Sequence, residues 1–165
     1  MQYLDPSEYV SFGLSAETAD ALVTAASAMI DSTCKRPTLA VVQYVECLAV
    51  RRHGTVQLSY GPLTATAPAT SPIVGLRVRM RKPSADLFSP LAYELAVFSM
   101  AGTWTDLDPS QVYVSPDGLL HFQSNLLTGS VAEAAVTYTA GYADIPVPVK
   151  IACAQMCATH RRPPR

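Results

Sequence analysis

The feature that most restricts the fold is a segment near the C-terminus with almost no polar side chain on any side. Ile145-Pro146-Val147-Pro148 holds the chain extended, because a residue before proline avoids the helical region, and a helix is then expected from Pro148 to about Thr159. Its long polar side chains are Lys150 and Gln155 alone. A helix that is apolar nearly all round is normally buried on more than one side. We therefore expect its second side to be covered by another chain, or the whole helix to lie centrally in this chain's own core.

Charged residues are too few to cover the surface of a domain of this length. The 165 residues suffice for one domain, and 49% of them are apolar and only 15% charged, against about 25% charged residues in typical soluble domains. No apolar run approaches the ~18 residues of a membrane span, and Met1–Asp5 lacks the regions of a signal peptide. The formal net charge of −1 argues against a dedicated nucleic-acid binder. We expect one domain over residues 1–165, without a membrane partner, that hides part of its surface in an assembly.

Residues 1–37 are predicted to be helical. Asp5-Pro6-Ser7-Glu8 has the capping residues of a helix start, and Gly13 would end this short helix. Ser15 is expected to cap a second helix over residues 16–35. Apolar residues at helical spacing define the side of this second helix that faces the core: Ala19, Leu22, Val23, Ala26, Met29 and Ile30. The polar side carries Glu17, Asp20, Thr24, Ser27 and Asp31.

Residues 38–142 are predicted to be mainly antiparallel β structure. Leu39–Val50 is rich in valine and tyrosine, and Ile73–Arg81 alternates between apolar and basic side chains. Ser115-Pro116-Asp117-Gly118 lies between two short apolar runs and predicts a hairpin turn. A further strand is expected over Val131–Tyr138.

These elements together predict an α+β fold. N-terminal helices over residues 1–37 and a C-terminal helix over residues 146–160 would pack with the antiparallel β insertion at residues 38–142, and a basic tail would follow over residues 161–165. Residues 84–102 are compatible with either a short helix or a strand.

A row of arginines marks the strand around residue 77. Arg77, Arg79 and Arg81 alternate with apolar residues, so their guanidinium groups would lie on one face of the strand, roughly 6.5–7 Å apart. The simpler interpretation is a solvated face, or partners for acidic groups of a neighbour. The alternative is a basic wall beside a passing polyanion, which would bind phosphates without base specificity.

The C-terminal region contains two candidate sites, each with a simpler alternative. Cys153 and Cys157 are four residues apart, which places both thiols on one helix face with His160 beyond them. Zinc would need a fourth ligand, so buried, reduced thiols are the preferred interpretation. His160–Arg165 would form a basic, extended hook, or simply a frayed chain end.

No catalytic, cofactor or metal site is predicted. The sequence lacks the serine-hydrolase elbow, the Gly-rich phosphate loop and the zinc-protease and Ca²⁺-loop motifs. His53, His121 and His160 have no evident partner nearby in sequence. Asp106 and Asp108 could imitate a glycosidase pair, but Asp-Pro-Ser is typical of a turn.

The order of several short motifs resembles the head–tail connector (adaptor) family of tailed bacteriophages, prophages and gene-transfer agents. The motifs consist of packing residues, include no catalytic signature and together cover most of the chain. They are Ile30–Pro37, Pro72–Val78, Trp104–Val114, Asp117–Leu120, Val136–Ala143, Ile145-Pro146 and Lys150–Ala152.

This resemblance implies a structural virion protein rather than an enzyme. Such proteins form a ring, usually of twelve copies, under the portal protein at the capsid vertex, after assembly in the host cytoplasm. The ring extends the DNA channel and docks the tail or stopper protein. DNA passes through the ring without sequence-specific binding. The resemblance implies that the C-terminal segment grips the portal. The residues expected at this partner interface are Met156, His160, Arg161, Arg162 and Arg165, and the arginine row would face the channel or a neighbouring subunit.

Three alternatives remain at this stage. One is another neck protein, a stopper or tail-completion factor. A second is a stand-alone β-sandwich binding module, for example for carbohydrate, with an aromatic platform made of Trp104 and either Tyr113 or Tyr138. The third is a small hydrolase that uses one of the histidines.

Overall fold

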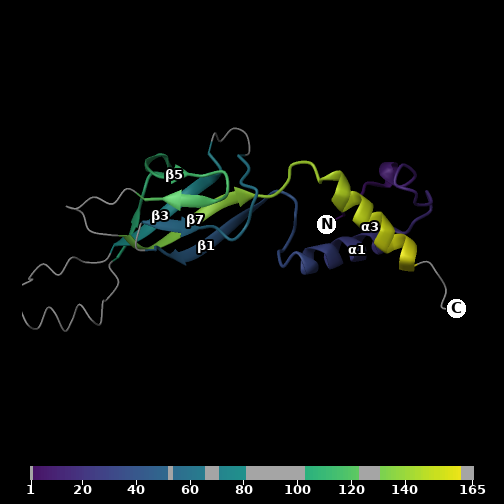
Figure 1. The fold of residues 1–165 in the computed structure, drawn as a ribbon, viewed down its shortest axis with the longest axis horizontal. Helices are drawn as coiled ribbons and strands as arrows, with labels where there is room; N and C mark the ends of the chain where they lie inside the picture. The colour runs from purple at the N-terminus through teal and green to yellow at the C-terminus, as the bar shows by residue number, and fades with distance from the viewer. Residues whose placement is uncertain (1, 52–53, 66–70, 81–102, 123–130, 161–165) are drawn as a thin grey trace, which may run out of the picture. The chain divides into compact units, whose positions relative to one another are not determined.

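The chain divides into two compact units, which are described separately. A computed structural model describes residues 2–51, 54–65, 71–80, 103–122 and 131–160 (Figure 1). The helical unit comprises Met1–Val42 and Gly141–Arg165, and the β unit comprises Gln43–Ala140. The chain therefore passes from one unit to the other twice. The assignment of residues 1–165 to one adaptor domain stays a prediction.

The helical unit contains two α-helices that lie side by side, α1 (Asp20–Thr33) and α3 (Val147–His160) (Figure 1). Helix α1 starts later than expected, because Ser15 caps a separate turn: its hydroxyl accepts from the Glu17 N–H at 3.3 Å, and its carbonyl accepts from the Thr18 N–H at 2.9 Å. Apolar residues from both helices and from the N-terminal segment form one buried core: Tyr3, Leu4, Tyr9, Leu14, Val23, Ala26, Ile30, Leu39, Cys153, Ala154 and Cys157.

The prediction of several N-terminal helices is wrong. Over residues 5–13 the structure has only η1 (Pro6–Glu8), a single 3₁₀ turn, and Gly13 leaves it with a φ of +78°. The buried positions here do not recur at helical spacing, so an amphipathic helix would not bury them, and a short helix does not offset its own nucleation cost. In the part of the chain that the structure describes, the fold is mixed α+β with one α-helix from each end and the strands dominating.

In its described residues the β unit has two antiparallel sheets. The larger has the order β1-β7-β3-β4 and the smaller the order β2-β6-β5. Their strands are β1 (Val42–Ala49), β2 (Thr55–Gln57), β3 (Ile73–Met80), β4 (Trp104–Asp106), β5 (Tyr113–Val114), β6 (Leu119–His121) and β7 (Val131–Ala140), and a 3₁₀ turn, η2 (Pro109–Gln111), precedes β5.

The predicted hairpin is confirmed. Strands β5 and β6 pair antiparallel, and the Ser115 N–H donates to the Leu119 carbonyl at 2.9 Å. Gly118 has a φ of +83°, which glycine adopts without steric cost. The core of this unit gathers residues of both sheets together with Leu58, which directly follows β2. The sheet residues are Val56, Leu76, Val78, Leu120, Ala134, Val136 and Tyr138.

Candidate interface surfaces

Helix α3 is buried on one side only. Cys153 and Cys157 are fully buried in the core of the helical unit, whereas Val147 is 58% exposed and Ile151 44% exposed. One face of the helix carries three exposed apolar residues at spacings i, i+4 and i+11: Val147, Ile151 and Ala158. The expected alternative of a wholly central helix is therefore wrong, and an apolar face of α3 remains uncovered.

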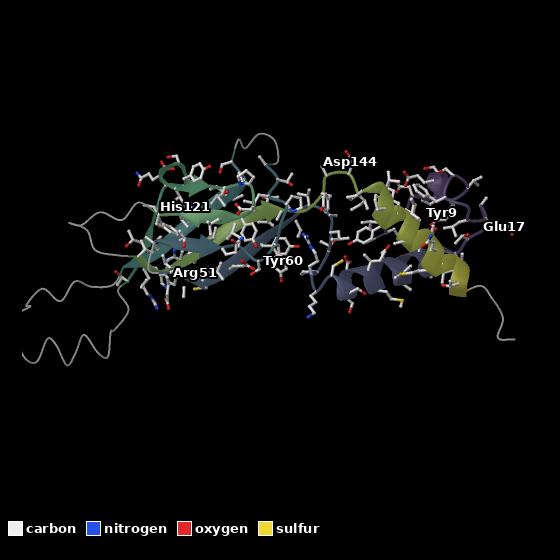
Figure 2. The ribbon with its side chains drawn as sticks, in the orientation of Figure 1. Tyr9, Glu17, Arg51, Tyr60, His121 and Asp144 are labelled. Carbon is white, nitrogen blue, oxygen red and sulfur yellow. The ribbon has the colours of Figure 1, made fainter. Side chains whose placement is uncertain are left out.

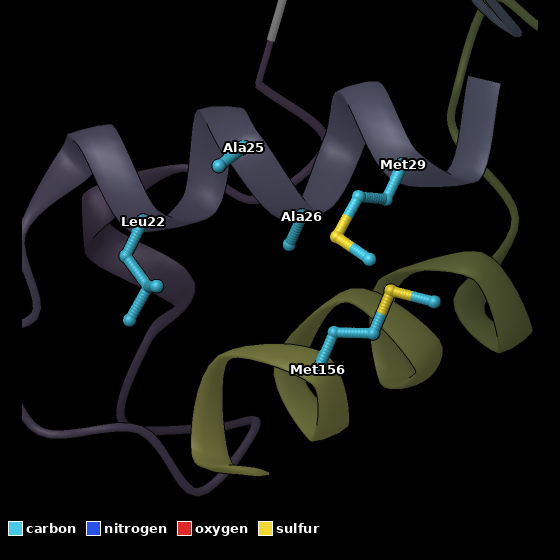
Figure 3. A pocket seen from close by; sticks show the side chains of 5 residues that line it. All are labelled: Leu22, Ala25, Ala26, Met29 and Met156. Atoms are coloured by element: carbon cyan, nitrogen blue, oxygen red, sulfur yellow. The ribbon is translucent and has the colours of Figure 1, made fainter. Parts of the chain in front are cut away.

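A shallow groove runs between α1 and α3. Its lining is apolar throughout: Leu22, Ala25, Ala26, Met29 and Met156. The thioether side chains of Met29 and Met156 extend toward each other across it (Figure 3). Its volume of ≈ 20 Å³ is far below the ~300–1,000 Å³ of small-molecule sites. The groove can accept part of one side chain, not a cofactor.

The groove residues were only partly predicted. Leu22, Ala26 and Met29 were assigned to the core side of α1, yet Met29 is 52% exposed. Ser27, which was assigned to the polar side, is fully buried; its hydroxyl donates to the Val23 carbonyl at 2.8 Å and accepts from the Tyr3 N–H at 3.1 Å. The buried side of α1 is thus rotated toward the N-terminal segment. The sequence does contain a pattern that indicates an exposed apolar side of α1, because residues 21–30 include no charged residue.

Residues 2–14, here called the strap, pack along α1 on the side away from the groove. The Gln2 side chain donates to the Asp20 carbonyl at 3.1 Å and to the Thr24 hydroxyl at 3.3 Å, and the Tyr3 hydroxyl donates to the Asp31 carboxylate. Burial, followed by the bond to Asp31, raises the pKa of Tyr3. No local sequence pattern indicates this arrangement.

Tyr9 and Glu8 tie the strap to both helices. Tyr9 is buried beside α3 (Figure 2) and its hydroxyl donates to the Asp20 carboxylate at 2.8 Å. Burial, together with this carboxylate, raises the pKa of Tyr9 to about 12. The Lys150 ammonium donates to the Glu8 carboxylate at 2.6 Å and lowers the pKa of Glu8. The strap is thus fixed by polar contacts at both ends of its buried stretch.

The C-terminal interface residues predicted from the resemblance are only partly described. Met156 lines the groove, and His160 is the last residue of α3. Arg161, Arg162 and Arg165 lie outside the described residues. The structure therefore brings Met156 into an apolar surface together with residues of α1.

The arginine row is engaged within the β unit. The Arg77 Nε lies 3.1 Å from the Asp106 carboxylate. An Arg79 terminal nitrogen donates to Glu133 at 3.0 Å, and its guanidinium lies 4.8 Å from the centre of the Trp104 ring. These contacts favour the interpretation as partners of acidic neighbours. Arg81 lies outside the described residues.

Candidate catalytic groups do not converge in the described part of the chain. Asp106 pairs with Arg77, and the Asp108 carboxylate accepts the Ser110 N–H at 2.9 Å as the cap of η2, which lowers the pKa of Asp108. His121 lies on β6, and its ring centre is 5.7 Å from that of Tyr113. His53 lies outside the described residues.

The other two kinds of site considered from the sequence are a metal site and an aromatic platform of Trp104 with Tyr113 or Tyr138. The described ranges hold no group of three or more His, Cys, Asp or Glu side chains placed to bind a metal ion. Tyr138 is fully buried and Trp104 is covered by Arg79, while Tyr113 is exposed on the other sheet. The three aromatic residues proposed for a carbohydrate platform therefore do not share a surface.

Comparison with known proteins provides no family assignment. No family model matches the chain, and no curated protein matches it. Among the helices of the described residues, none is long and apolar enough to span a membrane.

Proposed function

We propose that this chain is a structural protein of the neck of a tailed bacteriophage, prophage or gene-transfer particle. Its copies would form a ring beneath the portal, continue the DNA channel and dock the tail or stopper protein. The order of motifs described above supports this proposal, and in this role the protein carries out no reaction.

The observation that carries the proposal is the uncovered apolar face of α3. Val147 and Ile151 remain more than two-fifths exposed, on a helix whose long polar side chains are Lys150 and Gln155 alone. Because full burial of such a side chain is worth about 1.5–3 kcal/mol, covering its remaining exposed half is worth about 1 kcal/mol. A surface of this kind, in a chain with only 15% charged residues, is suited to a partner protein.

The charges of the β unit are also compatible with a channel through which DNA passes. Arg77 and Arg79 each lie against a carboxylate, so these two arginines offer little free positive charge. Because each additional phosphate contact strengthens binding to DNA, an unneutralised row would retard a passing strand.

The test mixes purified, portal-containing heads with the protein and images them by cryo-EM. We expect an added ring of density at the portal. Ile151→Asp should weaken its formation by about 10–100-fold, because a charge replaces one buried apolar side chain at the contact. Val45→Asp, a change at an exposed valine of β1, is the matched control and should leave the ring intact. A bare portal with the unmodified protein would refute the proposal.

A further inference from the structure

The strap and the groove occupy opposite faces of α1. The strap contacts α1 at positions 20, 24, 27 and 31, whereas α1 lines the groove with positions 22, 25, 26 and 29. Because successive helical residues are about 100° apart, the strap positions fall within about 60° of one another, and the groove positions centre about 180° away. One copy can therefore use both surfaces at the same time.

The strap itself presents an apolar knob. Val10 is 69% exposed, although Tyr9 next to it is buried. The surrounding turn is closed by backbone hydrogen bonds, from Gly13 N–H to the Val10 carbonyl at 3.1 Å and from Leu14 N–H to the Tyr9 carbonyl at 2.8 Å. The buried ring of Tyr9 and these bonds hold Val10 in a fixed, outward position.

The groove matches this knob in size and chemistry. It is apolar throughout, and its ≈ 20 Å³ accommodates a branched methyl group rather than an aromatic ring. Two of its walls are methionines, whose unbranched side chains adapt to an inserted group.

The charges around the two surfaces are complementary. Residues 2–19 carry three carboxylates and no cationic side chain; Glu8 is paired with Lys150 of the same copy, which leaves the exposed Asp5 and Glu17 for a neighbour. The opposite sign occurs just beyond the C-terminal end of α1 at the exposed Lys35, whereas the neighbouring Arg36 is half-buried and donates to the Thr38 carbonyl at 2.8 Å. A copy seated with its strap on the next copy's groove would bring these unlike charges near each other.

We propose that Val10 of one copy inserts into the Met29–Met156 groove of a second copy of this chain. The contact is head-to-tail and so can close into a ring; this inference rests on the proposed ring assembly. A single knob covers far less than the ~800 Å² per partner of a stable interface. The contact is therefore weak between free subunits and accumulates when a shared partner holds them together.

The test uses cysteine cross-linking in a background with the two exposed cysteines replaced, Cys34→Ser and Cys47→Ser. One preparation carries Val10→Cys and another Met29→Cys; they are mixed at about 1 mM, where a contact with a Kd near 1 mM is substantially populated, and oxidised mildly. A Val45→Cys preparation replaces Met29→Cys in the matched control. Circular dichroism of each variant confirms folding before mixing.

We expect the Val10→Cys and Met29→Cys mixture to form disulfide-linked dimers at least about tenfold faster than the control mixture, the ratio that corresponds to 1.4 kcal/mol of contact energy. Neither preparation alone should exceed the control, because a head-to-tail contact does not bring two Val10 positions together. Equal rates in the two mixtures would overturn the contact. If cryo-EM shows the ring on portal-containing heads but the cross-link does not form, the Val10 contact is refuted and the neck function is not. If the cross-link forms but no ring appears, the neck function is refuted and the contact is not.

Discussion

Gly141 has a backbone position that a side chain cannot share. Its φ is +130°, and a Cβ atom added to it would lie 2.2 Å from the Ala40 carbonyl oxygen. The adjoining Tyr142 N–H donates to the Leu39 carbonyl at 2.9 Å, so the two chain segments are held together at this point of the helical unit. The clash is with backbone atoms, which cannot rotate away as the end of a side chain can.

Gly141→Ala should therefore destabilise the protein by about 3 kcal/mol or more, from strain in the backbone together with displacement of the neighbouring segment. Urea unfolding measures the loss. Gly75→Ala is the matched control: its added Cβ would meet Thr137 at an ordinary 3.6 Å, and we expect a change within about 0.5–1 kcal/mol. Similar unfolding midpoints for the two variants would contradict the steric argument.

Tyr9 makes the helical unit sensitive to alkaline pH. Its pKa is raised to about 12 in the folded protein, mainly by burial, whereas an unfolded tyrosine titrates near 10. A raised pKa means that the stabilisation is complete below about pH 10 and is lost as the pH rises through the folded value.

We expect the unmodified protein to lose more stability between pH 9 and pH 12 than Tyr9→Phe, which has no hydroxyl to ionise at this position. Urea midpoints at several pH values in this range measure the difference. Tyr113→Phe, a change at an exposed ring, is the control and should follow the unmodified protein. Parallel curves for Tyr9→Phe and the unmodified protein would show that Tyr9 is not responsible.

At the scale of elements, local sequence patterns correctly predicted the turn and the strand whose structure depends on neighbouring residues. The hairpin at Ser115–Gly118 and the strand that became β7 were predicted from turn residues and alternation, and both are confirmed. The apolar circumference of α3 is compatible with a face covered by another chain or with a wholly central helix, and only the exposure of Val147 and Ile151 distinguishes the two. The N-terminal helix was wrong because capping residues are compatible with a single turn as well as with a helix.

The parts of the candidate site that sequence could not predict depend on contacts between distant segments. Nothing local to α1 shows that the strap occupies its Ser27 side and leaves Met29 exposed. The pairing of Arg77 with Asp106 follows from the register of β3 against β4, which alternation within one strand does not determine.

At the scale of the whole molecule, the two cores are separate and so need not unfold together. Leu4 is fully buried in the core of the helical unit, while Trp104, the single tryptophan of the chain, lies in the β unit. The far-ultraviolet signal of α1 and α3 and the fluorescence of Trp104 therefore report on different units.

Leu4→Ala should cost the helical unit about 2–5 kcal/mol, the usual loss for a leucine removed from a core. We expect the circular-dichroism transition at 222 nm to move to lower urea, while the Trp104 fluorescence transition stays in place. Val78→Ala, in the core of the β unit, should have the reverse effect. A common shift of both signals would show that the units unfold as one.

The β unit is inserted between the two halves of the helical unit, and this order has a consequence for synthesis. When α1 leaves the ribosome, the surface around Val23 and Ile30 has no α3 to cover it, because residues 147–160 are translated only after the whole β unit. At ≈ 5–20 residues per second, the nascent chain waits roughly 5–25 s for that cover. During this interval the β unit can fold completely, whereas half of the helical core is exposed to chaperones and to other nascent chains.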